Sequence, residues 1–219
     1  MSDKVGYAFE DNEGNLWLST DLGINKFDPL REKFTEYKPD PDNPIALSHN
    51  ISAAIHEDEK SNIWFYPATG GIDVLHQDIG DFTRLRHNPL NPDGLSLDSH
   101  SSYFLDKSGV LWLGADGVGL NKYVGEKNFF TTYKPSKGNP NALSARMVRA
   151  FAEDKNGNIW IALADQLNGG LSKMNRSDKT FTHYGHDPND PASVSSNNIL
   201  TLIEGNDGHL WIGTYSTGL

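Results

Sequence analysis

The chain has 219 residues, of which 37% are hydrophobic and 11% aromatic, and its formal net charge is -10. An acidic surface repels phosphate backbones and no basic patch offsets it, so we expect no nucleic-acid partner. The absence of cysteine excludes disulfides, thiolate metal sites and a cysteine nucleophile.

A turn signal recurs along the chain, each time shortly before a tryptophan. In the first four cases an aspartate stands six residues before the tryptophan, and Gly205 takes its place in the fifth. A glycine stands three residues before the tryptophan, except at Ser61. An aspartate that bonds forward to backbone amides, followed by a glycine with positive φ, is typical of a short loop between antiparallel strands. The residues are Asp11, Asp58, Asp106 and Asp154, with Gly14, Gly109, Gly157 and Gly208.

The tryptophans themselves lie between apolar residues and define an internal repeat. Successive tryptophans are 47, 48, 48 and 51 residues apart, a spacing typical of repeat architectures. Packing between neighbouring units requires one large residue at the same place in each, so we predict that every tryptophan is buried between sheets. A platform for stacking sugar rings or bases is the weaker alternative. The tryptophans are Trp17, Trp64, Trp112, Trp160 and Trp211.

A phenylalanine column follows each of the first four tryptophans and marks another β-rich run, so each complete repeat has four short strands and needs no helix. In the fourth repeat we predict strands at 148–153, 158–162, 170–174 and 180–184. Four-stranded units of this length match propeller blades. We therefore predict an all-β fold, a β-propeller made of four-stranded antiparallel blades, with a sandwich or barrel as the structural alternative. The phenylalanines are Phe34, Phe82, Phe130 and Phe181.

The repeats predict one propeller array over residues 4–219, with about four and a half blades. A ring does not close on half a blade, so we interpret the chain as a partial propeller, a segment of a larger array. The predicted units are 4–50, 51–98, 99–146 and 147–197, followed by the half unit 198–219.

A proline-rich linker joins the units, as in Asp40-Pro41-Asp42-Asn43-Pro44, which is followed by Leu47 and Ser48. Together with the Gly-Asn-apolar-Trp-apolar hairpin, it resembles the two-component regulator propeller repeat over residues 4–219. The resemblance implies an extracytoplasmic or periplasmic sensor region, joined through a membrane helix to a histidine kinase or a diguanylate cyclase, often sensing carbohydrate. This chain departs from the pattern at Ser61, and no apolar run in it is long enough to cross a bilayer. We expect no membrane segment or signal peptide in the chain. The other linkers are residues 88–96, 136–144 and 187–195.

Candidate ligand contacts lie where the first strand of each unit begins and the second strand ends. By analogy with other propellers, ligands sit on this face, and residues that break the repeat there are the informative ones. Local packing and loop drift are the simpler explanation for any one of them. The predicted ligand-binding residues are Tyr66, His100, Tyr103, Arg146, Arg149, Gln166 and Tyr215.

Catalytic and metal signals are weak, so we predict no catalytic residue, metal or cofactor. Residues 11–15 superficially resemble a calcium loop but lack its distal glutamate. His183 and His186 form a close pair with no third ligand. The adjacent Asp98, Ser99 and His100 do not make a triad, because neighbouring strand residues point to opposite faces.

We predict a binding or sensing module and not an enzyme. Two function classes remain in play, and a third is weaker. The first is a ligand-sensing module, with an oligosaccharide as the favoured small-molecule ligand. Such a module signals because the ligand binds one packing arrangement of the array more tightly than another. The second is a propeller enzyme such as a lyase, which needs convergent titratable groups that the inner-strand columns do not supply. The third is a pure protein-interaction scaffold.

Self-association is the expected partner interaction. The strand around Trp211 would present an unpaired backbone edge and an aromatic surface, which favours pairing with another chain. We predict a symmetric dimer formed by the terminal units. A monomer with a mobile segment at residues 198–219 is the alternative.

Overall fold

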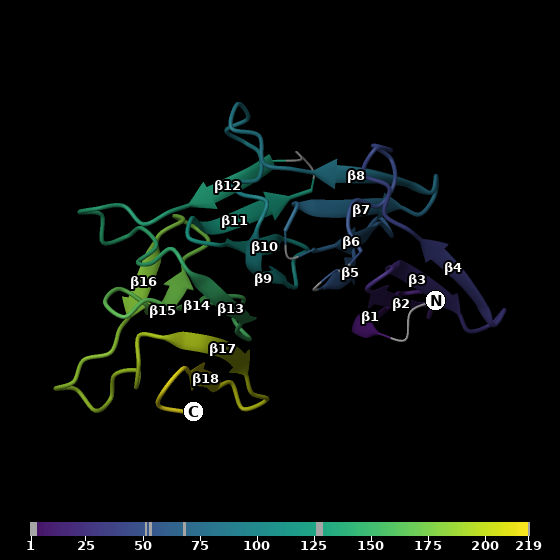
Figure 1. Ribbon diagram of the computed structural model, residues 1–219. Helices are drawn as coiled ribbons and strands as arrows, with labels where there is room; N and C mark the ends of the chain where they lie inside the picture. The colour runs from purple at the N-terminus through teal and green to yellow at the C-terminus, as the bar shows by residue number, and fades with distance from the viewer. Residues whose placement is uncertain (1–3, 51, 53, 68, 126–128, 219) are drawn as a thin grey trace. The chain divides into compact units, whose positions relative to one another are not determined.

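The computed structural model describes residues 4–50, 52, 54–67, 69–125 and 129–218. These residues form four four-stranded antiparallel sheets and one two-stranded sheet (Figure 1). The prediction of an all-β fold built from four-stranded blades is confirmed. No helix in the described part of the chain is long and apolar enough to span a bilayer.

The chain divides after Asn88 into two compact units, which are described separately. The prediction of a single array over residues 4–219 therefore stays a prediction, and its boundaries at residues 51 and 219 lie outside the described residues. In the first unit, one sheet consists of β1 (Val5–Glu10), β2 (Leu16–Thr20), β3 (Gly23–Asp28) and β4 (Lys33–Tyr37). Its second sheet consists of β5 (Ile55–Glu57), β6 (Ile63–Phe65), β7 (Ile72–His76) and β8 (Asp81–Leu85).

The second unit holds the other three sheets, and the first strands of these sheets are neighbours: β13 packs beside both β9 and β17. One sheet consists of β9 (His100–Leu105), β10 (Leu111–Ala115), β11 (Gly119–Val124) and β12 (Phe129–Tyr133). The next consists of β13 (Val148–Glu153), β14 (Ile159–Leu163), β15 (Gly170–Met174) and β16 (Phe181–Tyr184). The last contains β17 (Ile199–Glu204) and β18 (Leu210–Thr214). The strands predicted for the fourth repeat agree with β13 to β16 to within one residue at each end.

The aspartate of each hairpin turn binds both the turn and the tryptophan. In the third repeat, Asp106 Oδ1 accepts the backbone N–H groups of Ser108 (2.9 Å) and Val110 (3.0 Å). Its Oδ2 accepts the indole N–H of Trp112 (2.8 Å), a bond the sequence did not predict. We call this pair of contacts the Asp–Trp latch. The same indole bond joins Asp11 to Trp17, Asp58 to Trp64 and Asp154 to Trp160, at 2.8 to 2.9 Å.

Positive φ is found at the turn position where it was predicted, even without glycine. Gly109 has φ 76°, and Ser61, which replaces glycine in the second repeat, has φ 62°. Ser61 therefore adopts the left-handed conformation that the turn requires, at the steric cost a side chain carries there. The hairpin prediction holds in this repeat despite the departure from the pattern.

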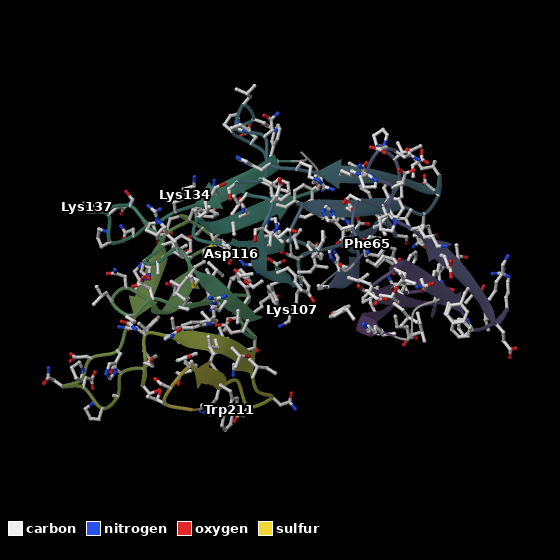
Figure 2. All side chains as sticks on the ribbon, in the orientation of Figure 1. Phe65, Lys107, Asp116, Lys134, Lys137 and Trp211 are labelled. Carbon is white, nitrogen blue, oxygen red and sulfur yellow. The ribbon has the colours of Figure 1, made fainter. Side chains whose placement is uncertain are left out.

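Four of the tryptophans lie in the core or at its margin, and the fifth does not. Trp17 packs against Tyr37 of its own sheet and against Phe65 of the next one. Trp112 is fully buried in a cluster that includes residues of the following sheet. Trp160 is half-buried, whereas Trp211 is 53% exposed (Figure 2). The prediction that every tryptophan is buried holds only in part for Trp160 and is wrong for Trp211, because the described chain contains no sheet after β18 to cover Trp211.

A glutamate at the end of the first strand ties each of three sheets to the turn of the sheet before it. Glu153 Oε2 accepts the backbone N–H of Lys107 (2.7 Å), the residue after the latch aspartate. Because a carboxylate bonded to a backbone donor is a charge-assisted contact, it adds to the apolar packing between neighbouring sheets. The equivalent bonds are Glu57 to Asn12 (2.7 Å) and Glu204 to Lys155 (2.8 Å).

Trp112→Ala is expected to lower the free energy of unfolding by about 3 to 5 kcal/mol, because it removes a fully buried aromatic side chain. Trp211→Ala is the matched control and should change it by less than about 1 kcal/mol, because that side chain is largely exposed. Urea denaturation of the two variants and the parent chain measures both. Equal effects at the two positions would contradict the assignment of Trp112 to the core.

Candidate functional site

The candidate site lies at what we call the entrance edge of each sheet, the edge where the first strand begins and the second strand ends. Within the described residues, a β-bulge marks the first strand there in the sheets that begin with β1, β9, β13 and β17. In β13, for example, Val148 pairs with Leu163 and Ala150 with Ala162, so Arg149 is the extra, unpaired residue. Bulges re-aim side chains and are frequent beside functional sites. The extra residues are Gly6, Ser101, Arg149 and Leu200.

The bulge that carries Arg149 is held from the neighbouring sheet. The Val148 carbonyl accepts hydrogen bonds from the hydroxyls of Ser101 (2.8 Å) and Ser102 (3.2 Å) in β9. At Gly114 in β10, a Cβ atom would lie 2.9 Å from both Val148 Cβ and Val148 O. Only glycine permits this approach, so β9 and β10 fix the backbone from which Arg149 projects.

Both predicted arginines are exposed at the start of β13. Arg149 Nη2 donates to the Met147 sulfur (2.8 Å). Among the described residues, neither Arg146 nor Arg149 takes part in an ion pair. Two guanidinium groups beside one strand end therefore offer donors for carboxylate, phosphate or hydroxyl oxygens of a ligand.

His100 begins β9 at the same edge, but its imidazole is turned inward. Both ring nitrogens are buried and have no hydrogen-bond partner among the described residues. Burial lowers the pKa of His100 to about 4, and the carboxylates of Asp98 and Asp116 oppose this shift only in part. His100 is therefore a neutral side chain at neutral pH. Tyr103, predicted with it, lies further along β9 opposite Leu113 and is half-buried.

Gln166 and Tyr215 are exposed in loops that follow the second strands of the last two sheets. The Gln166 carbonyl accepts the side-chain amide of Asn197 (3.3 Å), and the Tyr215 N–H donates to the carbonyl of Asn198 (2.9 Å). Tyr215 has a 73% exposed side chain. The structure thus brings His100, Arg146, Arg149, Gln166 and Tyr215 to the entrance edge of three neighbouring sheets, whereas Tyr103 lies away from it.

Asn197 organises this part of the edge, and sequence reasoning missed it. Its carbonyl accepts the N–H of Gly170 (2.8 Å), its Oδ1 accepts the N–H of His186 (2.7 Å), and its amide reaches Gln166. The signal that could have found it is the extra length of the fourth repeat around Gln166, since a longer loop needs a partner for its added backbone groups.

Tyr66 lies in the first unit, where its side chain is only 4% exposed. Its hydroxyl is 2.9 Å from His56 Nδ1, and the two rings stack with centroids 5.5 Å apart. Burial lowers the pKa of His56 to about 4, with a small opposing effect of Asp58. The ring of His56 also stacks on Trp64. Tyr66 is thus built into a packed aromatic cluster, and its role in ligand binding stays a prediction.

The histidine pair singled out by the sequence is used in structural contacts. His183 Nδ1 lies 2.8 Å from the Ser172 hydroxyl and Nε2 lies 2.7 Å from the Ala142 carbonyl. His186 Nδ1 lies 2.9 Å from the Val194 carbonyl. In the described ranges, no group of three or more His, Asp or Glu side chains is arranged to hold a metal ion.

Two segments of the second unit, residues 142–165 and 193–216, match the model of the two component regulator propeller family. This chain carries two-component regulator propeller repeats. Each match contains one latch region or its counterpart, one tryptophan and the entrance edge of one first strand. The comparison with curated proteins gave no match.

Solved structures share the fold of these repeats at low sequence identity. The extracellular domain assigned to the hybrid two component system BT3049 from B. thetaiotaomicron is 22% identical, with a TM-score of 0.76 over 98% of this chain and 28% of that one. PorZ, a surface component of the type-IX secretion system of Porphyromonas gingivalis, is 16% identical, with a TM-score of 0.66 over 98% of this chain and 31% of that one. The calcium-binding protein regucalcin from Agrobacterium tumefaciens is 12% identical, with a TM-score of 0.54 over 96% of this chain and 67% of that one.

This chain therefore spans less than a third of the first two matched structures. The three proteins differ in what their names describe: a hybrid two component system, a secretion component and a calcium-binding protein. The shared fold alone does not assign a function, which has to be argued from the site.

The buried histidines predict an acid-sensitive fold. His56 protonates near pH 6.5 in the unfolded chain but only near pH 4 in the folded one, so the unfolded state binds the extra proton between these values. The free energy of unfolding should fall by up to about 3 kcal/mol as the pH drops from 6.5 to 4. His56→Phe should remove this part of the loss, whereas the exposed control His209→Gln should retain it. Denaturation curves between pH 7 and 4 that fall equally in both variants would contradict the prediction.

Proposed function

We propose that this chain is a ligand-sensing segment of an extracytoplasmic propeller in a bacterial signalling protein, and that its ligand is an oligosaccharide. The two matched propeller repeats support the signalling role. The fold shared with an extracellular domain of a hybrid two component system supports an extracytoplasmic location, as part of a longer membrane-anchored protein. In this proposal the chain belongs to one propeller array and binds its ligand without changing it chemically.

The observation that carries the proposal is the bulge at Arg149. The backbone at Val148 is fixed by two serine hydroxyls of β9, yet the side chain that follows it projects into solvent. A rigid backbone that presents a long donor side chain is typical of a binding site. Because the backbone is already ordered in the free protein, less conformational entropy is lost when a ligand binds.

Sugar chemistry fits the side chains of the same edge. Guanidinium groups of Arg146 and Arg149 donate to hydroxyl or carboxylate oxygens, and the amide of Gln166 can both donate and accept. The exposed ring of Tyr215 offers a flat apolar face of the kind that packs against a sugar ring. A ligand bound across neighbouring first strands would favour one packing of those strands over another, which supplies the free energy for a signal.

Isothermal titration with a panel of neutral and acidic oligosaccharides tests the proposal. We expect saturable binding of at least one of them, weakened about tenfold or more by Arg149→Ala, the loss expected for a charge-assisted hydrogen bond. The matched control is Arg31→Ala, which removes an exposed arginine at the β3–β4 turn, away from the entrance edge. Equal affinity of the Arg149→Ala variant and the parent chain would overturn the site assignment.

A further inference from the structure

A polar cavity of about 420 Å³ lies on the first sheet, in the first unit. This volume falls within the range of about 300 to 1,000 Å³ that is usual for small-molecule sites. The cavity is lined by β3, β4 and the hairpin turns beside them. These turns lie at the opposite end of the strands from the entrance edge, so the cavity is separate from the candidate site described above.

The cavity is on the face of the first sheet that packs against the second sheet. Trp17, Lys26 and Thr35 are cross-strand partners, so their side chains share this face. Trp17 packs against Phe65 of the second sheet, and Lys26 Nζ donates to Gln77 Oε1 (2.8 Å) in its β7–β8 turn. Any sheet that preceded the first one would pack on the opposite face and would not cover this cavity.

The second sheet fills the corresponding space with a histidine. His76 stands at the position of Asp28 in the repeat, and its two ring nitrogens lie 2.9 Å from Asn62 Oδ1 and 2.9 Å from Thr83 Oγ1. The first sheet lacks this bridge, because Asp28 binds the β3–β4 turn instead. Its carboxylate accepts a guanidinium N–H (2.5 Å) and the backbone N–H (3.1 Å) of Arg31.

The third sheet has its corresponding space filled by the sheet that follows it. Arg176 of the following sheet donates to the Ser108 hydroxyl (3.1 Å) in the hairpin turn. Gln77 is the counterpart of Arg176 in the second sheet, but its side chain is shorter. Its amide is also held by Lys26 and by the Ser61 carbonyl (2.9 Å). The cavity is therefore left open beside the first sheet.

The wall of the cavity is held in place by the core. The ring of Tyr37 stacks on Trp17, with centroids 5.7 Å apart, and meets Phe82 of the second sheet edge-on at 5.8 Å. Lys26 Nζ lies 5.1 Å from the Trp17 ring centroid and 3.8 Å from Asp11 Oδ2. Burial raises the pKa of Tyr37, so its hydroxyl is a donor at neutral pH. Side chains ordered in advance lose less entropy when a ligand binds.

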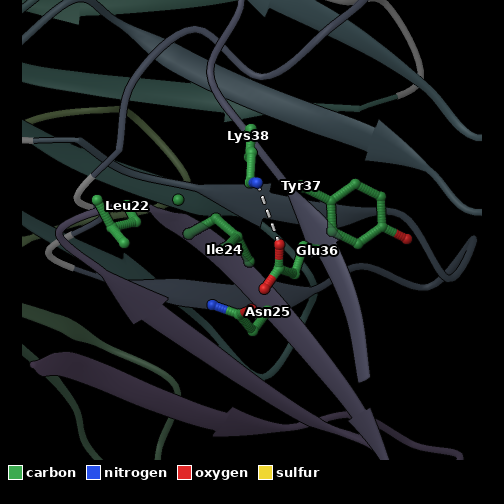
Figure 3. A pocket seen from close by; sticks show the side chains of 7 residues that line it. Leu22, Ile24, Asn25, Glu36, Tyr37 and Lys38 are labelled. Atoms are coloured by element: carbon green, nitrogen blue, oxygen red, sulfur yellow. Dashed lines mark ion pairs between the residues drawn. The ribbon is translucent and has the colours of Figure 1, made fainter. Parts of the chain in front are cut away.

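Tyr37 also borders a smaller cavity between β3 and β4, which does not suit a ligand (Figure 3). Its volume is about 50 Å³, far below that of small-molecule sites. Its two charged side chains, Glu36 and Lys38, pair with each other at 3.4 Å. Figure 3 shows the hydroxyl of Tyr37 directed away from this ion pair.

The charged side chains of the larger cavity leave one cation and one carboxylate available to a ligand. Among the described residues, Lys33 Nζ takes part in no hydrogen bond or ion pair. Only Oε2 of the Glu13 carboxylate accepts a hydrogen bond, from the Asn15 amide at 3.4 Å. The hydroxyls of Thr35 and Tyr37 have no hydrogen-bond partner in the described part of the chain. A ligand that satisfies these groups carries a carboxylate, an ammonium group and further polar atoms.

We propose that this cavity binds a small polar zwitterion of the class of free α-amino acids. Lys33 binds the carboxylate of the ligand and Glu13 binds its ammonium group. The hydroxyls of Thr35 and Tyr37 bind its polar side chain. This is a second ligand site, and its occupancy does not require the oligosaccharide site around Arg149.

Titration of the isotope-labelled full chain with L-glutamine, followed by two-dimensional amide NMR spectra, tests the site. We expect saturable shifts of the backbone amide signals of Asn15, Lys33 and Thr35. N-acetyl-L-glutamine lacks the ammonium group and L-glutaminamide lacks the carboxylate. Each should bind about tenfold or more weakly than L-glutamine, the loss expected for a hydrogen bond between charged groups. These measurements use the parent chain and do not depend on the folding of a variant.

A lysine variant tests the assignment of the carboxylate. Lys33→Ala should weaken L-glutamine binding about tenfold or more but leave the binding of L-glutaminamide unchanged. Lys137→Ala is the matched control, because it removes an exposed lysine from a linker of the second unit, and it should bind L-glutamine as the parent chain does. Absence of saturable shifts, shifts confined to the entrance edge around Arg149, or equal binding of L-glutamine and N-acetyl-L-glutamine would each overturn the proposal.

Discussion

The Asp–Trp latch is the interaction on which the packing of the sheets depends. An indole carries a polar N–H group, and burying that group without a partner would offset much of the gain from burying the ring. In four repeats the aspartate at the hairpin turn removes this penalty, as in the 2.8 Å bond from Trp112 to Asp106. The same carboxylate accepts the backbone donors of the turn, so turn geometry and tryptophan position are fixed together.

The electrostatics of the latch show that it is held in its charged form. Burial alone would raise the pKa of Asp106, but hydrogen bonds from Ser108, Trp112 and Val110 and the charge of Arg176 outweigh burial and lower it. The net pKa of Asp11, Asp58 and Asp154 is lowered in the same way. These carboxylates stabilise the fold above the ordinary pKa of an aspartate, and that contribution is lost as the pH falls below it. In the fifth repeat Gly205 replaces the aspartate, and Trp211 there is exposed.

The turn that carries the latch also contacts the following sheet. The N–H group after the latch aspartate donates to a glutamate of the following sheet, as Lys107 does to Glu153 (2.7 Å). The linkers add a second contact at the outer strands, where the backbone N–H of Phe82 donates to the carbonyl of Ile45 (2.9 Å) and that of Phe130 to the carbonyl of Asp93 (2.8 Å). A sheet that is held to its neighbour by both contacts is less stable when it stands alone. This dependence on neighbours is expected of repeat proteins.

The sequence predicted the parts of the fold that depend on local rules. Turn chemistry at Asp106 and Gly109 and the alternation around Trp112 predicted the hairpins, because such signals act within a few residues. Burial of Trp211 was predicted wrongly, since the repeat pattern does not say whether a sheet follows. For the candidate site, the sequence predicted the end of the sheets at which most of its residues lie, and their role in ligand binding stays a prediction. Nothing in the residue pattern indicated that Arg149 sits on a bulge held by Ser101, or that Tyr66 bonds to His56, because both depend on contacts between strands.

A double-mutant cycle between Asp106 and Trp112 tests the latch most directly. Asp106→Asn weakens the acceptor, Trp112→Phe removes the indole N–H while keeping an aromatic ring, and urea denaturation of both single variants and the double variant gives the coupling free energy. If the latch is a real bond between these two groups, the coupling should be about 1 to 3 kcal/mol, as for hydrogen bonds to charged groups. Effects that add to within about 0.5 kcal/mol would show that the carboxylate and the indole stabilise the fold independently, which would contradict the account.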